Sequence, residues 1–187
     1  MTIWFTSDNH FGHHNIIKYC NRPFKTVEEM DETMISNWNA AVKDEYDIVY
    51  HLGDFTFGDF DLAQKYFSQL EGRIRILSNA WHHDKYWLKG THIFTSKNGH
   101  LVEILPPMVV LEYPYTLVLC HYPIAWWDRR HYGSWHLHGH SHGTYIHKED
   151  DLAFDVGVDC NQFYPISLEG VVRQMNECEI INKKIES

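Results

Sequence analysis

Residues 3–10 read Ile3-Trp4-Phe5-Thr6-Ser7-Asp8-Asn9-His10, an apolar run that ends abruptly in polar residues. The first four are typical of a short buried β-strand, and the next four place a carboxylate and an imidazole directly after it. A second strand-like run, residues 47–52, is closed in a similar way by Gly53 and Asp54. Loops at the carboxyl ends of parallel strands converge, so we expect these polar residues to share one crevice.

Outside these two runs, the hydrophobic pattern predicts helices first and mostly strands later. Residues 26–44 have apolar side chains at helical spacing, and Thr26 with Glu29 has the spacing of a capping box. Residues 59–70 predict another helix, and Ser167 is expected to cap a last helix that reaches about Met175. The further strand-like runs are residues 73–77, 101–105, 108–113, 116–120, 135–138 and 154–158. This order indicates a mixed α/β protein with two sheets, or one large mixed sheet, and helices outside.

Composition limits the classes of function. The 187 residues contain no repeat or linker, which predicts a single domain over residues 1–187. The formal net charge of −9 gives no general attraction to a nucleic-acid backbone or to an anionic membrane. We expect a cytoplasmic protein with four reduced cysteines, because the apolar stretches are short, no basic leader is visible and no C-x-x-C pair occurs. The 15 histidines point to metal or proton chemistry.

Residue types that bind metals follow several predicted strands. They are Asp8-Asn9-His10, Gly53-Asp54, Asn79, His121 and Gly139-His140-Ser141-His142. In extended chain, residues two apart point to the same side, so a D-x-H or H-x-H pair can hold one ion or two neighbouring ions. Gly53 permits the tight turn that brings Asp54 back over its strand end. Each element alone is common, but their joint order is specific.

In these residues the sequence resembles the calcineurin-like metallophosphoesterase family, most closely its small bacterial and phage members. The resemblance runs from Ser7 almost to the last helix, and its blocks are residues 7–13, 50–54 and 137–142. It implies a four-layer α/β/β/α sandwich, in which two mixed β-sheets are flanked by helices. It also implies a dimetal-dependent hydrolase that cleaves a phosphoric ester by in-line attack of a metal-bridging hydroxide.

The same resemblance implies the ligands of two divalent ions. Asp8, His10, Asp54 and His142 would hold one ion, and Asp54, Asn79, His121 and His140 would hold the other, with Asp54 bridging. The donor set of carboxylates, imidazoles and one amide lacks a thiolate. We expect manganese first, with iron, zinc, cobalt or nickel as alternatives.

One block departs from the family pattern. Where the family usually reads Gly-Asn-His-Asp, this chain reads Ser78-Asn79-Ala80-Trp81-His82-His83-Asp84. Asn79 keeps its place after a predicted strand, whereas the histidine that acts as general acid is missing from the next position. His83 would protonate the leaving group after a short insertion, with His82 as the alternative, and Asp54 completes the predicted catalytic set.

The substrate follows from these residues only as a class. Small size and the lack of long insertions favour a phosphodiester or a nucleotide-type phosphoester, including a short nucleic-acid end, over a phosphoprotein. The alternatives are a phosphomonoesterase, a nuclease, and a catalytically weakened metal-binding module with the same fold. Arg22 is a candidate for contact with a phosphate. We expect no membrane association and no obligate protein partner.

Overall fold

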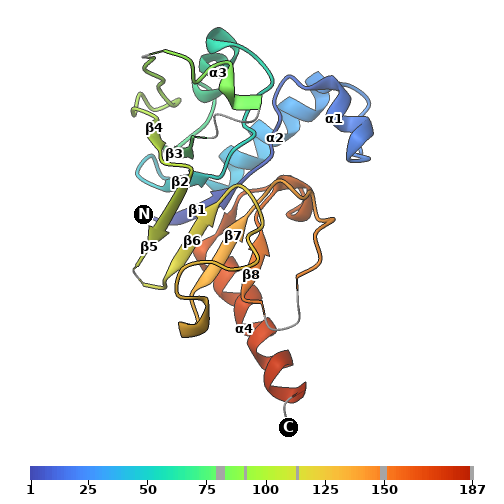
Figure 1. The fold of residues 1–187 in the computed structure, drawn as a ribbon. Coiled ribbons are helices and arrows are strands. Elements are labelled where there is room, and N and C mark those ends of the chain that lie inside the picture. The colour runs from blue at the N-terminus through green and yellow to red at the C-terminus, as the bar shows by residue number, and fades with distance from the viewer. Residues whose placement is uncertain (79–82, 91, 113, 148–150, 186–187) are drawn as a thin grey trace.

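The computed structural model describes residues 1–78, 83–90, 92–112, 114–147 and 151–185. Within them nine strands form two sheets, stacked one above the other (Figure 1). The first sheet has the order β4-β3-β2-β1-β9, and the second has the order β5-β6-β7-β8. The strands are β1 (Ile3–Thr6), β2 (Ile48–His51), β3 (Arg73–Leu77), β4 (Glu103–Leu105), β5 (Met108–Leu111), β6 (Leu117–Cys120), β7 (Trp135–His138), β8 (Ala153–Asp155) and β9 (Ile166–Ser167).

Both sheets are mixed, as the sequence predicts. Strands β1 to β4 are parallel to their neighbours, and β9 joins β1 in the antiparallel direction. In the second sheet β6, β7 and β8 are parallel, and β5 is antiparallel to β6. The carboxyl ends of β1 and β2 therefore lie at one edge of the first sheet, and those of β6 and β7 at one edge of the second.

The helices begin where their caps predict. Thr26 Oγ1 accepts the Glu29 N–H at 3.2 Å at the start of α2 (Val27–Ala41), and Asp59 caps α3 (Phe60–Phe67) through the Leu62 N–H. The Glu29 carboxylate accepts the N–H of Lys25, so the capping box is shifted by one residue. Two helices differ from the prediction: α1 (His14–Tyr19) was not predicted, and α4 (Leu168–Ile185) continues beyond Met175.

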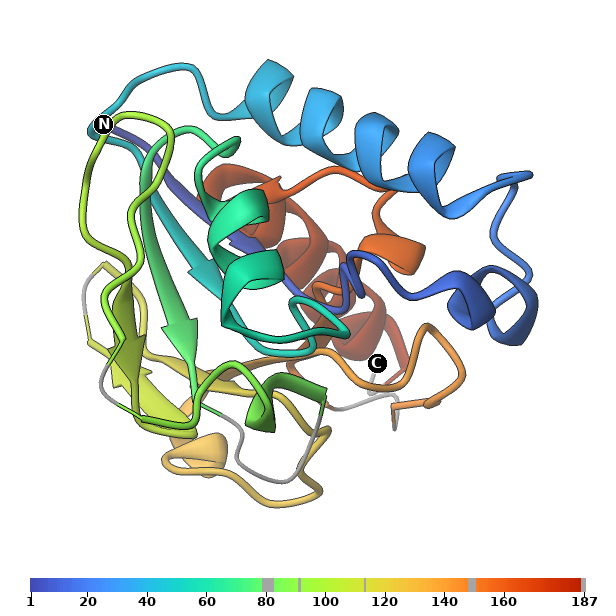
Figure 2. The same ribbon diagram turned by 90° about the horizontal axis from the view of Figure 1, so that it is seen from above.

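Strand alternation divides the apolar side chains between two main clusters. In β1 and β2, Trp4 and Val49 face α2 and α3, whereas Phe5 and Tyr50 face the second sheet. In the second sheet Leu117, Leu119, Trp135 and Leu137 pack into the same inter-sheet cluster. The helices α2 and α3 lie over the first sheet when the molecule is seen from above (Figure 2). The core therefore has one layer between helices and sheet and another between the two sheets.

The fourth layer of the expected α/β/β/α sandwich differs. Helix α4 contributes Val171 and Met175 to the inter-sheet cluster, so it completes that core. On the outer face of the second sheet, the described residues form a smaller cluster in which Trp127 covers Val118 and Ala153. Trp127 belongs to the loop that carries a 3₁₀ turn, Arg130–Tyr132. A loop anchored by one large indole ring takes the place that a helix was expected to occupy.

Three of the four cysteines, which were predicted to be reduced, have described side chains. Cys20, Cys120 and Cys160 are free. Cys178 lies outside the described side chains.

Candidate metal centre

Four loops from the two sheets meet at the candidate site. The loops after β1 and β2 carry Asp8, His10 and Asp54, and those after β6 and β7 carry His121, His140 and His142. Between the first two loops, backbone hydrogen bonds continue the pairing of the strands: Asp8 N–H to Gly53 O at 3.0 Å, and His10 N–H to Asp54 O at 3.0 Å. The site is thus built at strand ends, as predicted.

The side chains converge for a different reason from the one expected. The D-x-H and H-x-H pairs were predicted to converge through extended chain, and this is wrong. The φ angles of Asp8, His10, Asp54, His140 and His142 are all positive, between 46° and 65°. Non-glycine residues occupy this left-handed region at a cost of roughly 1–2 kcal/mol each, and such residues concentrate at functional sites. Loops with left-handed backbone conformations, rather than the alternation of a strand, bring these candidate ligands together.

The loops approach so closely that one position requires glycine. A Cβ atom on Gly139 would lie 2.2 Å from both Asp8 Oδ2 and Ser7 Oγ. The next residue, His140, donates its backbone N–H to Asp8 Oδ2 at 2.9 Å. The second sheet therefore contacts the first through the Asp8 carboxylate.

The candidate ligating atoms form two groups. Asp8, His10 and His142 offer atoms that all lie within 4.8 Å of one another, and so do Asp54, His121 and His140. Asp54 Oδ2 lies 3.5 Å from His10 Nε2 in the first group and 3.5 Å from His121 Nε2 in the second. Asp54 thus stands between the two groups, at the position expected of a bridging ligand.

The spacing of these atoms suits shared ions. Two ligands bound to one ion at about 2.1 Å and at a tetrahedral angle lie about 3.4 Å apart. In the first group, Asp8 Oδ1 lies 3.9 Å from both His10 Nε2 and His142 Nε2, too far for a direct hydrogen bond. Neither ring nitrogen of His10 has a hydrogen-bond partner among the described residues, although the side chain is only 2% exposed. Buried polar atoms without partners are rare, and a metal ligand is one such case.

Burial also adjusts the ionisation of this group. It lowers the pKa of His10 well below its usual range, so this ring is neutral, as a metal ligand must be. It raises the pKa of the Asp8 carboxyl, which a nearby cation would reverse. Burial lowers the pKa of His142 too, but the hydrogen bond that His142 donates to Asp159, a hydrogen bond with Cys20 and the charges of Asp8 and Asp159 outweigh it and raise the pKa to about 10. An ion bound by His142 would therefore displace a proton.

His51 links the first two loops, a role that the sequence did not reveal. Its Nδ1 accepts the Gly53 N–H at 3.1 Å, so its Nε2 carries the proton and donates to Asn9 Oδ1 at 2.9 Å. Burial lowers the pKa of His51 to about 3, which keeps the ring neutral. His51 thus joins Asn9, which lies between the predicted ligands Asp8 and His10, to Gly53, which precedes the predicted ligand Asp54.

Arg22 is structural, so the expectation that it contacts a phosphate is wrong. Its side chain is fully buried, and all five N–H donors have acceptors. Nε and Nη2 bind the two oxygens of Asp159, each at 2.8 Å, and the remaining donors reach the carbonyls of Asp8 and Asn9 and the Met30 sulfur. Asp159 Oδ2 also lies 2.6 Å from His142 Nδ1. No sequence signal connects Arg22 to Asp159, which lies 137 positions away.

His83 lies at the rim of the site. Its ring centroid is 5.2 Å from that of His10 and 5.3 Å from that of His13. Phe57 packs against both His13 and His83, at 4.6 and 5.0 Å. The predicted ligand Asn79 and the alternative acid His82 lie outside the described residues.

Asp84, next to His83, holds the loop that follows Asp54. Its carboxylate accepts the Phe55 N–H at 3.0 Å and the Trp87 indole N–H at 2.7 Å. Burial, together with the Asp54 charge, raises the pKa of Asp84 to about 7. The 3₁₀ turn that carries His83 is in this way tied to the loop that carries Asp54.

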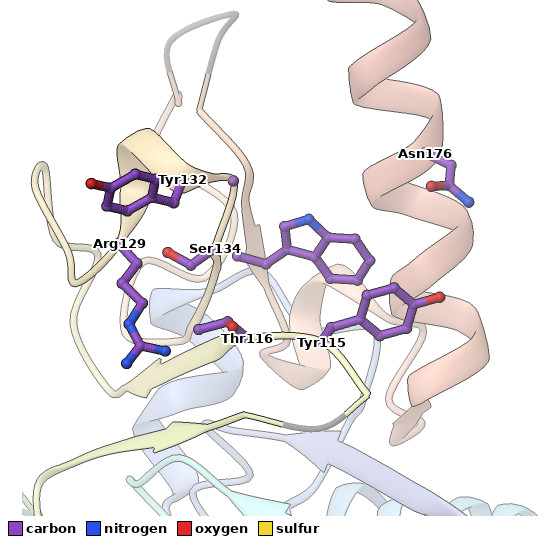
Figure 3. Close-up of a pocket in the computed structure, with 8 residues that line it drawn as sticks. Tyr115, Thr116, Arg129, Tyr132, Ser134 and Asn176 are labelled. Atoms are coloured by element: carbon purple, nitrogen blue, oxygen red, sulfur yellow. The ribbon is translucent and has the colours of Figure 1, made fainter.

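A cavity of about 350 Å³ lies away from this centre (Figure 3). It is lined by Tyr115, Thr116, Arg129, Tyr132, Gly133, Ser134, Trp135 and Asn176. Thr116 and Trp135 lie at the amino ends of β6 and β7, whereas His121 and His140 follow the carboxyl ends. The cavity and the candidate metal centre are therefore at opposite ends of the second sheet.

Comparison with known proteins identifies a family. No protein-family model matches the chain. The uncharacterized protein MJ1445 of Methanocaldococcus jannaschii is 32% identical over 187 residues, covering 96% of this chain and 94% of that protein. The chain belongs to the MJ1445 family. The gene 66 protein of Mycobacterium phage L5 is 28% identical over 171 residues and covers 76% of this chain and 78% of its own length.

The fold of this MJ1445 family member occurs in a solved structure. A protein of unknown function from Aquifex aeolicus, AQ665, superposes with a TM-score of 0.65 at 22% identity, over 92% of this chain and 98% of that one. At this identity the likeness concerns the fold alone. Among the helices described, none combines the length and apolar character needed to cross a membrane.

Proposed function

We propose that the protein is a dimetal-dependent phosphoesterase of the calcineurin-like type, acting on a phosphodiester or a nucleotide-type phosphoester. The observation that carries this proposal is the placement of Asp54 Oδ2 at 3.5 Å from a histidine of each ligand group. Asp8, His10 and His142 would hold one ion and His121 and His140 the other, with Asp54 between them. Divalent ions bound there would polarise phosphoryl oxygens and lower the pKa of a water ligand.

The charge of the site supports binding of an anion. Two divalent ions bring four positive charges, while Asp8 and Asp54 bring two negative ones. The histidine ligands bind as neutral rings. The centre would therefore stay locally positive, although the whole chain carries a net charge of −9. A phosphate is attracted by this local excess rather than by the surface as a whole.

The position of His83 supports a role as proton donor. It lies beside His10, and its partly exposed ring can receive protons from solvent. His13 and Phe57 pack against the same ring and limit its orientation. We assign His83 the protonation of the departing oxygen, a step that matters most for poor leaving groups.

The first experiment compares two esters. Purified protein reloaded with Mn²⁺ should hydrolyse bis(p-nitrophenyl) phosphate faster than p-nitrophenyl phosphate, and EDTA should abolish both activities. Faster turnover of the monoester would reassign the enzyme as a phosphomonoesterase. A protein that binds Mn²⁺ but cleaves neither ester would be the metal-binding module instead.

The matched variants are Asp54→Asn and Asp61→Asn. Asp61 lies exposed in the first turn of α3, so its loss should leave the rate within about twofold of the native rate. Asp54→Asn removes the charge between the two ligand groups and should lower the rate by at least about 10³-fold. Native turnover by Asp54→Asn would exclude the dimetal mechanism.

A further inference from the structure

Asp159 and Arg22 form a buried unit behind one of the candidate ligands. Asp159 Oδ2 lies 2.6 Å from His142 Nδ1, and both carboxylate oxygens accept hydrogen bonds from Arg22 at 2.8 Å. We propose that Asp159, clamped by Arg22, is a positioning residue that orients the His142 ring for ion binding. This inference rests on the metal centre of the proposed function and adds the residues that determine its affinity.

His142 is the ligand of the first group that most needs orientation. Its side chain is 18% exposed, whereas those of His10 and Asp8 are 2% and 0% exposed. Burial therefore restrains His10, and burial with the His140 N–H restrains Asp8, but the His142 ring is more open on one side. The contact with Asp159 fixes Nδ1, so Nε2 on the opposite side of the ring faces Asp8 Oδ1 at 3.9 Å.

The contact also selects the useful tautomer. The Asp159 carboxylate accepts the Nδ1 proton, so Nε2 is the nitrogen whose proton an ion would displace. A carboxylate behind the ring further increases the basicity of the ligating nitrogen. The other neutral tautomer of His142, with its proton on Nε2, would direct an N–H at the ion.

Arg22 gives Asp159 its fixed position. The planar guanidinium binds the carboxylate through two parallel hydrogen bonds, a geometry that lysine cannot reproduce. The same guanidinium donates to Asp8 O at 2.7 Å and to Asn9 O at 3.0 Å. Arg22 therefore fixes the loop that carries Asp8 relative to Asp159, the hydrogen-bond partner of His142.

A separate ion site at this place is the competing interpretation. Cys20, His142 and Asp159 offer atoms that all lie within 4.8 Å of one another. Both Asp159 oxygens, however, already accept hydrogen bonds from Arg22, and one of them also contacts His142. A cation there would lie against the buried guanidinium, so the cluster fits a support for His142 better than a third site.

The test measures Mn²⁺ binding by calorimetry, without substrate. Asp159→Asn keeps the size of the side chain but removes its charge, and we expect Mn²⁺ to bind 10- to 100-fold more weakly at one of two sites. Asp151→Asn is the matched control, because Asp151 is also a largely buried carboxylate paired with an arginine, Arg130, away from the centre. The control should bind Mn²⁺ within about twofold of the native protein.

Each outcome either supports or overturns the role proposed for Asp159. An unchanged affinity of Asp159→Asn, or equal losses in both variants, would overturn the inference. A native protein that takes up no ion would refute the metal centre of the proposed function itself. In a His142→Ala background, Asp159→Asn should cause no further loss, because the two residues act through one ligand. Should Asp159→Asn fail to fold, Asp159→Glu replaces it: a partial loss of about 3- to 10-fold is expected, and native affinity would overturn the inference.

Discussion

The role proposed for His83 rests on the location of its ring. His83 lies beside the candidate ligand His10 and is only partly buried, so solvent can reach its ring. A proton donor at this place should matter little for a stable anion such as p-nitrophenolate. It should matter greatly for an alkoxide, which cannot depart without a proton.

His83→Ala should therefore separate the two kinds of substrate. With an alkyl ester we expect a rate loss of about 10²- to 10³-fold, and with the p-nitrophenyl diester a loss under about tenfold. His14→Ala, at an exposed position nearby, is the control and should leave both rates unchanged. Steady-state rates on both esters provide the measurement. If His82→Ala shows the selective loss instead, the general acid is His82.

The positions of the candidate ligands could be predicted from the sequence, whereas the residues that support them could not. Asp8, His10 and Asp54 each follow a strand whose apolar run is visible in the sequence, so their meeting point follows from topology. Asp159 and Arg22 lie 137 positions apart and carry no local pattern, because a buried ion pair depends only on the final packing. The left-handed φ angles were missed for the same reason, since they arise from contacts between loops.

At the level of elements, strand β7 shows how alternation assigns roles. Trp135 and Leu137 point into the inter-sheet core, and His136 points to the outer face beneath Trp127. His136 Nε2 accepts the Ile124 N–H at 3.1 Å, so its Nδ1 carries the proton and donates to Val118 O at 2.9 Å. The strand was predicted correctly from its length and pattern. The covering loop was not, because the segment 122–134 that carries Trp127 has the regular spacing of neither a strand nor a helix.

His136 should make the second sheet sensitive to acid. Burial lowers its pKa to about 4, compared with about 6.5 in an unfolded chain. Between these values the unfolded state binds more protons, so the free energy of unfolding falls as the pH decreases from about 6.5 to 4. Over this pH range His136 should lower the free energy of unfolding by about 3 kcal/mol in total.

Urea denaturation at a series of pH values tests this expectation. His136→Gln should be less stable than the native protein at pH 7, but its free energy of unfolding should fall less steeply between pH 6.5 and 4. His131→Gln, at an exposed position, should keep the native slope. Parallel curves for all three proteins would show that His136 does not titrate in this way.

At the scale of the whole molecule, the candidate centre is a place where polar groups join the two sheets. The first sheet contributes Asp8, His10 and Asp54, and the second contributes three histidines. Gly139 lets the loops touch, and the His140 N–H binds the Asp8 carboxylate. Ions held between these loops would connect the sheets, while the apolar layer between them supplies the remaining contact.

Metal should therefore stabilise the whole fold rather than a single loop. An ion that binds only the folded state at 100 times its Kd adds about 2.7 kcal/mol to the free energy of unfolding. For a domain of this size, that corresponds to a rise of roughly 5–10 °C in Tm per site. Scanning calorimetry with Mn²⁺ and then with excess EDTA measures the effect. Asp54→Asn should lose most of the increase, because Asp54 contacts both ligand groups, whereas Asp61→Asn should keep it. A native Tm that does not respond to Mn²⁺ would mean that these six side chains do not form a metal centre.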